Sequence, residues 1–184
     1  MEIRTIFLIA AAQTAFLHSC KKQDNTAYIN PELKKHFNFK EGSYWIYRDS
    51  LTGSMDTFTV YNNITTITER DPYRSETLIE IQRIELRCSK DPDILSGYFS
   101  LMNNSATYIF PHFKYGTGVN YEYFSDPTRL MIHSSNGISF DSVVQITPDS
   151  STFYIKKDIG FVKLRLMKDT IRKVWELQQW KIVQ

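Results

Sequence analysis

The sequence predicts an all-β protein, a single antiparallel meander that forms either a sandwich or a half-closed barrel. Aromatic residues make up 14% of the chain, a density that favours pleated sheet over helix. Short apolar runs recur at intervals of roughly ten residues, with turn residues between them. No stretch of helical length separates these runs, so a parallel sheet with crossover helices is not expected.

Length and charge bound the class of protein. The 184 residues suffice for one domain with a core, and the formal charge is only +2. A dedicated nucleic-acid binder would need a clear basic excess, so no nucleic-acid partner is predicted. Hydrophobic residues make up 42% of the chain, which excludes a disordered protein.

The chain begins with a segment typical of a secretory signal peptide, residues 1–19. Its apolar run is too short to span a bilayer, which needs about 20 residues. The end of this segment, Leu17-His18-Ser19-Cys20, resembles a bacterial lipobox, although His18 departs from the usual small or β-branched residue. The resemblance implies cleavage before Cys20, with diacylglycerol on its sulfur and an acyl chain on its new amino group.

This reading divides the chain into a signal peptide (1–19), a lipidated tether (20–36) and a β-rich body (37–184). It predicts attachment to a membrane of the bacterial cell envelope through Cys20, with no membrane-spanning segment. Lys21-Lys22-Gln23-Asp24 lacks an acidic cluster that marks surface export, which favours the periplasmic face of the outer membrane.

The chain contains two cysteines, and acylation of Cys20 leaves Cys88 without an intramolecular partner. Cys88 alternates in phase with Ile84 and Leu86, so we expect it to face the core as a small apolar residue. The alternative is a catalytic thiolate activated by basic neighbours.

The expected elements begin with a short helical turn started by Pro31. Strands follow, separated by turn residues such as Asn62-Asn63, the glycine loop Tyr115–Gly118 and the hairpin turn Asn136-Gly137. The expected strands are Ser43–Asp49, Met55–Asn62, Thr65–Arg70, Glu76–Cys88, Leu95–Met102, Ala106–Phe113, Val119–Phe124, Arg129–His133, Ile138–Thr147, Thr152–Lys156, Gly160–Met167 and Ile171–Ile182.

Two long strands change the phase of their apolar residues. Ile79 and Ile81 give way to Ile84 and Leu86, which predicts a β-bulge near Gln82-Arg83. A second phase change, from Trp175 and Leu177 to Trp180 and Ile182, predicts a bulge near Gln178-Gln179. Bulges bend strands and favour a curved sheet.

Both ends of the body resemble small bacterial lipoproteins. The segment Phe37–Tyr47 contains a glycine followed by W-x-Y on the first strand, and Ile159–Lys163 is similar to their closing G-[ILFV]-V-K strand. Most such lipoproteins lack an assigned activity, so the resemblance implies the compartment and the β-fold only.

In the bacteria that these lipoproteins come from, Asp-[Ser/Thr]-small aliphatic tripeptides mark O-glycosylation. The tripeptides at Ser50, Ser142 and Thr170 match this signal. The same dipeptides also suit turns and strand ends.

No catalytic motif is present. His36, His112 and His133 have no metal-ligand spacing, and the chain lacks a nucleophile elbow, a P-loop and a Rossmann glycine pattern. We therefore predict no catalytic residue, no metal and no cofactor. A carboxylate pair for glycoside hydrolysis stays open, because it needs only spatial proximity.

Aromatic residues gather around the expected glycine loop. They form a candidate stacking platform for a sugar or an apolar ligand, or alternatively core and cross-strand pairs. The candidate platform residues are Trp45, Tyr108, Phe110, Phe113, Tyr115, Tyr121 and Tyr123.

Three functions follow as hypotheses. The favoured one is a non-enzymatic envelope lipoprotein that binds a partner protein or a glycan. The second is a lipocalin-like carrier whose curved sheet encloses an apolar ligand. The third is a hydrolase with an unrecognised site. A carrier must leave a large apolar cavity, whereas an interaction module should fill its core.

Overall fold

The computed structural model describes residues 25–71, 75–110, 115–120, 122–147, 151–168 and 171–184, and the residues expected to form the signal peptide lie outside it. Strands dominate, with a few short helices. The elements are α2 (Pro31–Phe37), β1 (Tyr44–Asp49), β2 (Met55–Asp71), β3 (Ser75–Cys88), β4 (Asp91–Met102), β5 (Ser105–Phe110), β6 (Tyr115–Asn120), α3 (Glu122–Ser125), the 3₁₀ turn η2 (Pro127–Arg129), β7 (Leu130–Ser135), β8 (Ile138–Ile146), β9 (Thr152–Lys156), β10 (Gly160–Lys168) and β11 (Ile171–Lys181).

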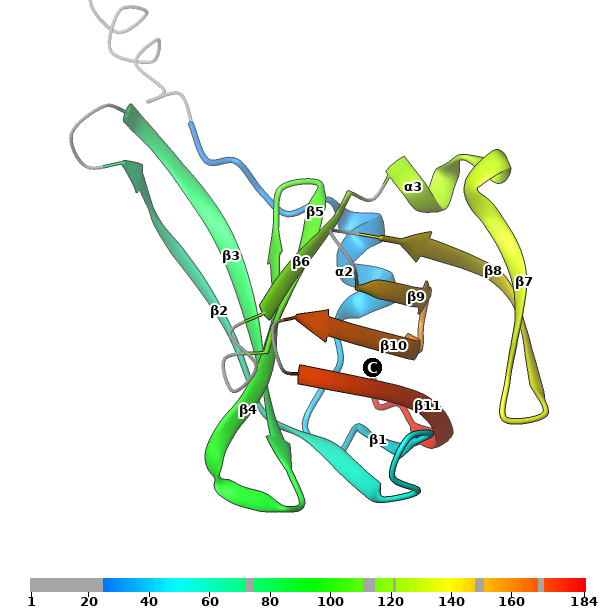
Figure 1. Cartoon of the computed structure of the whole chain (residues 1–184). Helices are drawn as coiled ribbons and strands as arrows, with labels where there is room; N and C mark the ends of the chain where they lie inside the picture. The colour runs from blue at the N-terminus through cyan, green and yellow to red at the C-terminus, as the bar shows by residue number, and fades with distance from the viewer. Residues whose placement is uncertain (1–24, 72–74, 111–114, 121, 148–150, 169–170) are drawn as a thin grey trace, which may run out of the picture.

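The described strands form one antiparallel sheet of eleven strands in the order β6-β5-β4-β3-β2-β1-β11-β10-β9-β8-β7. Strands that are consecutive in sequence pair with each other, except β6 and β7, and at the centre β1 pairs with β11 as well as with β2. The sheet is curved but not closed, because β6 and β7 are its two edges (Figure 1). The predicted all-β antiparallel meander is therefore confirmed.

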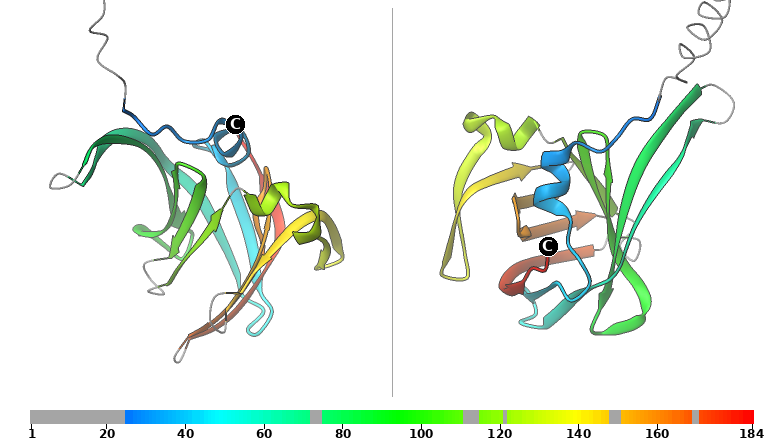
Figure 2. Two further views of the ribbon diagram at one scale, coloured as in Figure 1. Left: turned by 90° about the horizontal axis from the view of Figure 1, so that it is seen from above. Right: turned by 180° about the vertical axis from the view of Figure 1, so that it is seen from behind.

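The hydrophobic core lies on the inner side of this curve. Trp45, Phe99 and Phe161 reach it from three different strands and are at most 3% exposed. The helix α2 lies against β4 and β5 and adds Phe37, whose ring centroid is 5.3 Å from that of Phe124 in α3. The two helices thus extend the core that the sheet encloses (Figure 2).

The helix α2 has the signals that its sequence predicts. Pro31 lies at its start, and the Asn30 side chain accepts a hydrogen bond of 2.9 Å from the backbone N–H of Glu32. Its apolar face buries Leu33 completely, and Ile29 just before it is 2% exposed. The packed body therefore begins before residue 37, the boundary expected from the sequence.

The expected turn at Asn62-Asn63 is wrong. β2 runs without a break from Met55 to Asp71, and Tyr61 is an extra residue at an irregularity in its pairing with β3. The Asn63 side chain faces inward and donates a hydrogen bond of 3.0 Å to the backbone oxygen of Phe39. Asn63 thus provides a polar contact for the segment after α2.

The expected glycine loop is also wrong. Gly116 and Gly118 lie inside β6 and pair with Ile109 and Thr107 of β5. The strand expected over Val119–Phe124 divides, since β6 ends at Asn120 and α3 begins at Glu122. Pairing with the neighbouring strand overrides the weak strand preference of glycine here.

Of the two predicted bulges, one is confirmed. Ile46 pairs with Gln179 and Tyr47 with Leu177, so Gln178 is the extra residue. The bulge at Gln82-Arg83 is absent, because β3 keeps one phase throughout. Glu80 and Gln82 are buried at 7% and 4% exposure on the same side as Ile84 and Leu86.

Candidate functional site

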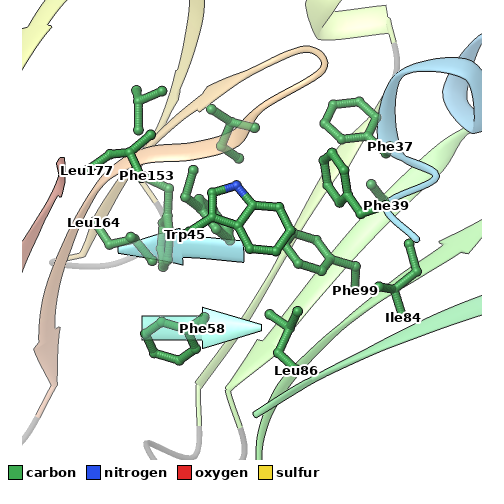
Figure 3. Close-up of a cluster of buried hydrophobic side chains, with 14 of the residues drawn as sticks. Phe37, Phe39, Trp45, Phe58, Ile84, Leu86, Phe99, Phe153, Leu164 and Leu177 are labelled. Carbon is green, nitrogen blue, oxygen red and sulfur yellow. The ribbon is translucent and has the colours of Figure 1, made fainter. Parts of the chain in front are cut away.

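The pocket between the central strands, as lined by the described residues, leaves almost no room for a ligand. The pocket between the central strands has a volume of about 10 Å³, which is the space of a single water molecule. Large apolar side chains fill the remainder (Figure 3). The pocket is lined by Trp45, Tyr47, Phe58, Leu86, Phe99, Phe161, Leu164 and Trp175.

Trp45 belongs to this core. It is 1% exposed, and its indole N–H donates a hydrogen bond of 2.5 Å to the backbone oxygen of Ile159. Phe39 packs edge-on against the ring at a centroid distance of 5.0 Å. Because the side chain is buried, Trp45 is not available for stacking on a ligand.

The other described candidate platform residues lie on β5, β6 and α3. Phe110 is paired with Tyr115 in the backbone register of β5 and β6, and Tyr108 lies two positions earlier in β5. Tyr123 lies in α3, with the Arg129 guanidinium 4.5 Å from its ring centroid. The remaining two candidates, Phe113 and Tyr121, lie outside the described residues.

Cys20 and Thr170 also lie outside the described residues, so two candidate modification sites have no structural context. Ser142 is exposed at a backbone irregularity, where it has a φ of 52°. Ser50 follows β1, and its neighbour Asp49 is fully buried.

The burial of Asp49 has a structural explanation. Its carboxylate accepts hydrogen bonds from the Leu51 N–H at 3.1 Å and the Thr52 hydroxyl at 2.9 Å, and Lys173 lies 3.3 Å away. Burial raises the pKa of this carboxyl, but the hydrogen bonds outweigh burial and lower it overall. Asp49 therefore closes the turn at the end of β1, whether or not Ser50 is modified.

Cys88 is partly buried on the core side of β3, as predicted. Its thiol donates to an Asp56 carboxylate oxygen at 3.4 Å, and Lys90 forms an ion pair of 3.1 Å with the same carboxylate. Burial, together with the nearby negative charge of Asp56, raises the pKa of the Cys88 thiol. A raised thiol pKa opposes the thiolate that a nucleophile needs.

His133 occupies the most unusual polar environment among the described histidines. Its ring stacks on Tyr154 at a centroid distance of 4.0 Å, so the two side chains meet across β8, which lies between β7 and β9 in the sheet. Its Nε2 is buried without a hydrogen-bond partner, and burial lowers its pKa, helped by the charge of Lys163. Lys163 itself pairs with Glu176 at 2.7 Å.

This arrangement does not form a recognisable catalytic site. The 2.7 Å pair leaves the Glu176 carboxylate held by Lys163, which lowers the Glu176 pKa and favours its charged form. Elsewhere His36 bonds to Asp158 at 2.8 Å near the surface, and His112 lies outside the described residues. Within the described ranges, histidine, cysteine and acidic side chains form no group of three that could hold a metal ion.

Exposed apolar side chains occur at several places, and two of them are candidate contact surfaces. The first is the arm, which we define as residues 62–71 and 75–80. There the β2–β3 ribbon extends beyond both neighbours, because β1 pairs with β2 only as far as Thr59 and β4 pairs with β3 only from Ile81. On the arm, Ile64 is 42% exposed, Ile67 55% and Leu78 38%.

The second place is the edge strand β7, on the opposite side of the molecule (Figures 1 and 2). Ile132 is 76% exposed and Met131 39% exposed. The β7–β8 register shifts between Met131 and His133, where Asp141 and Ser142 of β8 lie opposite Ile132 alone, so the extra residue belongs to β8. Among the described strands, β7 pairs with β8 alone and leaves its other edge open.

Neither surface was among the sequence-based site predictions, although both had a signal. Leu130-Met131-Ile132 is a run of three apolar residues, and alternation cannot turn all of them toward the core. In the arm, Ile64 and Ile67 lie three positions apart and therefore on opposite faces of β2.

Comparisons with family models, curated proteins and solved structures find no match for this chain. In the part of the chain that the structure describes, no helix has the length and apolar character to cross a membrane.

Proposed function

We propose that this chain is a lipid-anchored protein of the bacterial cell envelope that acts as a non-enzymatic binding module for a partner protein. Cys20 carries the anchor at one end, and the edge strand β7 is the contact surface at the other. The observation that carries the proposal is the open edge of β7 with the exposed Ile132.

The properties of β7 support a binding role. An edge strand presents unpaired backbone N–H and C=O groups, and natural proteins usually protect such strands with charges, proline or a covering segment. β7 has the sequence Leu-Met-Ile-His-Ser-Ser and presents Met131 and Ile132 beside its open edge. An extended partner segment can add to such an edge through main-chain hydrogen bonds, with the apolar side chains providing selectivity.

The filled interior favours a binding module over a carrier. Ligand pockets for drug-sized molecules occupy about 300–1,000 Å³. The cavity of about 10 Å³ in this core is far below that range. The same packing leaves the curved sheet as a rigid support for its exposed edge.

The anchor is tested by metabolic labelling with a radioactive fatty acid in a bacterial host. We expect label on the native chain and none on the Cys20→Ser variant. Native mass spectrometry of protein purified from the membrane should show the mass of the acyl groups. An unlabelled native chain would overturn the anchor, and a retained apolar ligand would favour the carrier function instead.

The binding surface is tested with a photoreactive amino acid placed at Ile132, in cells, with the same residue at exposed Arg165 on β10 as the matched control. We expect one discrete protein adduct from position 132 and none from position 165. The Ile132→Asp variant should weaken co-purification of the crosslinked partner. Equal crosslinking at both positions, or an unaffected Ile132→Asp variant, would contradict the assignment of β7.

A further inference from the structure

The described chain enters the body alongside the arm. The Ala27 N–H donates a hydrogen bond of 2.7 Å to the backbone oxygen of Leu78, and the Glu80 N–H donates one of 2.9 Å to the Ala27 oxygen. Ala27 thereby forms a parallel bridge with Ile79 of β3, at the edge that β4 leaves free. Figure 1 shows this N-terminal segment (blue) running from the arm to α2.

Three further contacts hold the segment in place after Ala27. The Ile29 N–H donates to the Glu80 carboxylate at 3.1 Å, and Lys34 pairs with the same carboxylate at 2.5 Å. The Asn30 N–H donates a hydrogen bond of 2.8 Å to the oxygen of Asn103. The point at which the chain leaves the body is therefore fixed against the β3 strand of the arm, next to the residue where β4 begins to pair.

The length of the tether limits how far the body can lie from the anchor. Seven residues lead from Cys20 to Ala27, and a fully extended chain of that length spans about 25 Å at most. This reach is about the same as the thickness of a small domain. A lipid group on Cys20 therefore keeps the arm close to the bilayer, and β7 on the far side of the sheet away from it.

The side chains around this exit point suit a lipid surface. Ile67 and Tyr28 are each 55% exposed, and Leu78 is 38% exposed. Ile67 lies opposite Glu80 in the β2–β3 register, and the charge of Glu80 is neutralised by Lys34. Glu69, opposite Leu78, is an exposed acid that suits the headgroup layer and not the hydrocarbon layer.

We propose that the arm rests on the lipid surface, with Ile67, Leu78 and Tyr28 at the boundary between headgroups and acyl chains. This proposal rests on the proposed anchor at Cys20. Apolar and aromatic side chains bind at this boundary, and a second contact adds to the hold of the lipid chains. The contact fixes the orientation of the body, so that β7 is presented to partners away from the membrane.

The experiment uses the full acylated chain, purified from bacterial membranes and placed in vesicles of phosphatidylethanolamine and phosphatidylglycerol. A Cys88→Ser background leaves one reactive thiol in each of three variants: Ile67→Cys, Leu78→Cys and, as the matched control, Ile132→Cys. Each thiol is labelled with an environment-sensitive fluorophore. Quenching is measured with lipids that carry a nitroxide near the headgroup.

We expect the labels at positions 67 and 78 to be quenched at least threefold more than the label at position 132. Their emission should also shift to shorter wavelength when vesicles are added. Circular dichroism checks that each variant keeps the sheet, and Leu78→Cys decides the outcome if Ile67→Cys does not fold.

The two ways of failing are distinguishable. Protein that does not float with the vesicles overturns the anchor and, with it, this proposal. Protein that floats but shows equal quenching at positions 67, 78 and 132 overturns the arm contact and leaves the anchor intact.

Discussion

The ion pair between Glu80 and Lys34 joins the N-terminal segment to the arm, and its removal gives a sharp test of the fold. Glu80→Gln keeps the size of the side chain and an oxygen that can accept from Ile29 N–H. It removes the charge that Lys34 contacts at 2.5 Å. The decrease in the free energy of unfolding therefore measures the contribution of the Glu80 charge to its contact with Lys34.

The size of the expected decrease in the free energy of unfolding follows from the burial of Glu80 and Lys34. The Glu80 side chain is 10% exposed and the Lys34 side chain 36%. A charged hydrogen bond contributes about 1.5–3 kcal/mol, and the partial exposure of Lys34 reduces that value through solvent screening. We expect Glu80→Gln to lower the free energy of unfolding by about 1.5 kcal/mol at neutral pH.

The pH dependence identifies the mechanism. The hydrogen bond from Lys34 is the largest contribution that lowers the Glu80 pKa below its usual value. The stabilisation is therefore fully present above the unfolded pKa of about 4.3 and is lost as the pH falls through the lowered folded value. The difference in the free energy of unfolding between the native chain and Glu80→Gln should become smaller at acid pH.

Urea denaturation at several pH values measures both effects. Glu85→Gln on the same strand is the control, because Glu85 pairs at 3.1 Å with Arg83, whose side chain is 46% exposed. We expect the control to cost about 0.5 kcal/mol or less. Equal losses in the two variants, or a Glu80→Gln difference that persists unchanged into acid, would refute the reasoning.

Three other predictions concern the core and the β7 hairpin. Gly160 has a φ of 91°, and an added Cβ would meet Phe39 at an ordinary 3.6 Å. Gly160→Ala should therefore lower the free energy of unfolding only by the backbone strain that it introduces, about 1–2 kcal/mol. Gly53→Ala, in open space at a φ of 75°, should lose a similar amount in urea titrations; a much larger loss at Gly160 would show that the core cannot accommodate the methyl group. Cys88 should react with a thiol reagent more slowly than a free thiol, since burial raises its pKa, and urea should remove the difference; fast labelling of the folded chain would contradict this. Burial lowers the pKa of His133, so the stability it supports is present above its unfolded pKa of about 6.5 and decreases as the pH falls below that value. His133→Gln should flatten the stability profile over that range, and an unchanged profile would count against the burial of the ring.

Most of the fold was predictable because strand alternation and turn residues are local signals. The bulge at Gln178 was found from its sequence neighbours, because Trp175 and Leu177 occupy one phase and Trp180 the other. A change of phase between large apolar residues on one strand leaves few alternatives.

The same rule failed on β3 because its buried polar residues have distant partners. Glu80 is buried through Lys34, 46 positions earlier, and Gln82 donates to Asn38, 44 positions earlier. No pattern within β3 reveals such partners, so the apolar Ile79 and Ile81 were assigned to the core side. Ile79 and Ile81 lie on the other face of β3 from Glu80 and Gln82, which shows that hydrogen bonds to distant partners can outweigh apolar alternation.

The exposed surfaces were harder to predict than the core for a related reason. The sequence shows that Ile132 and Ile67 are apolar, but their exposure depends on where neighbouring strands stop. β4 pairs with β3 only from Ile81 onward, and Ile132 lies on the edge strand β7, opposite a bulge in β8. Both are properties of the assembled sheet.

The position of β1 between β2 and β11 has a consequence for how the chain matures. The Ser43 hydroxyl and the Val183 backbone exchange hydrogen bonds of 3.2 and 3.0 Å across a separation of 140 positions. A nascent chain that lacks β11 therefore exposes two unpaired strand edges at the middle of the sheet, those of β1 and β10. Exposed strand edges favour misassembly, so β11, which pairs with both β1 and β10, joins the two halves of the sheet only when the last part of the chain is present.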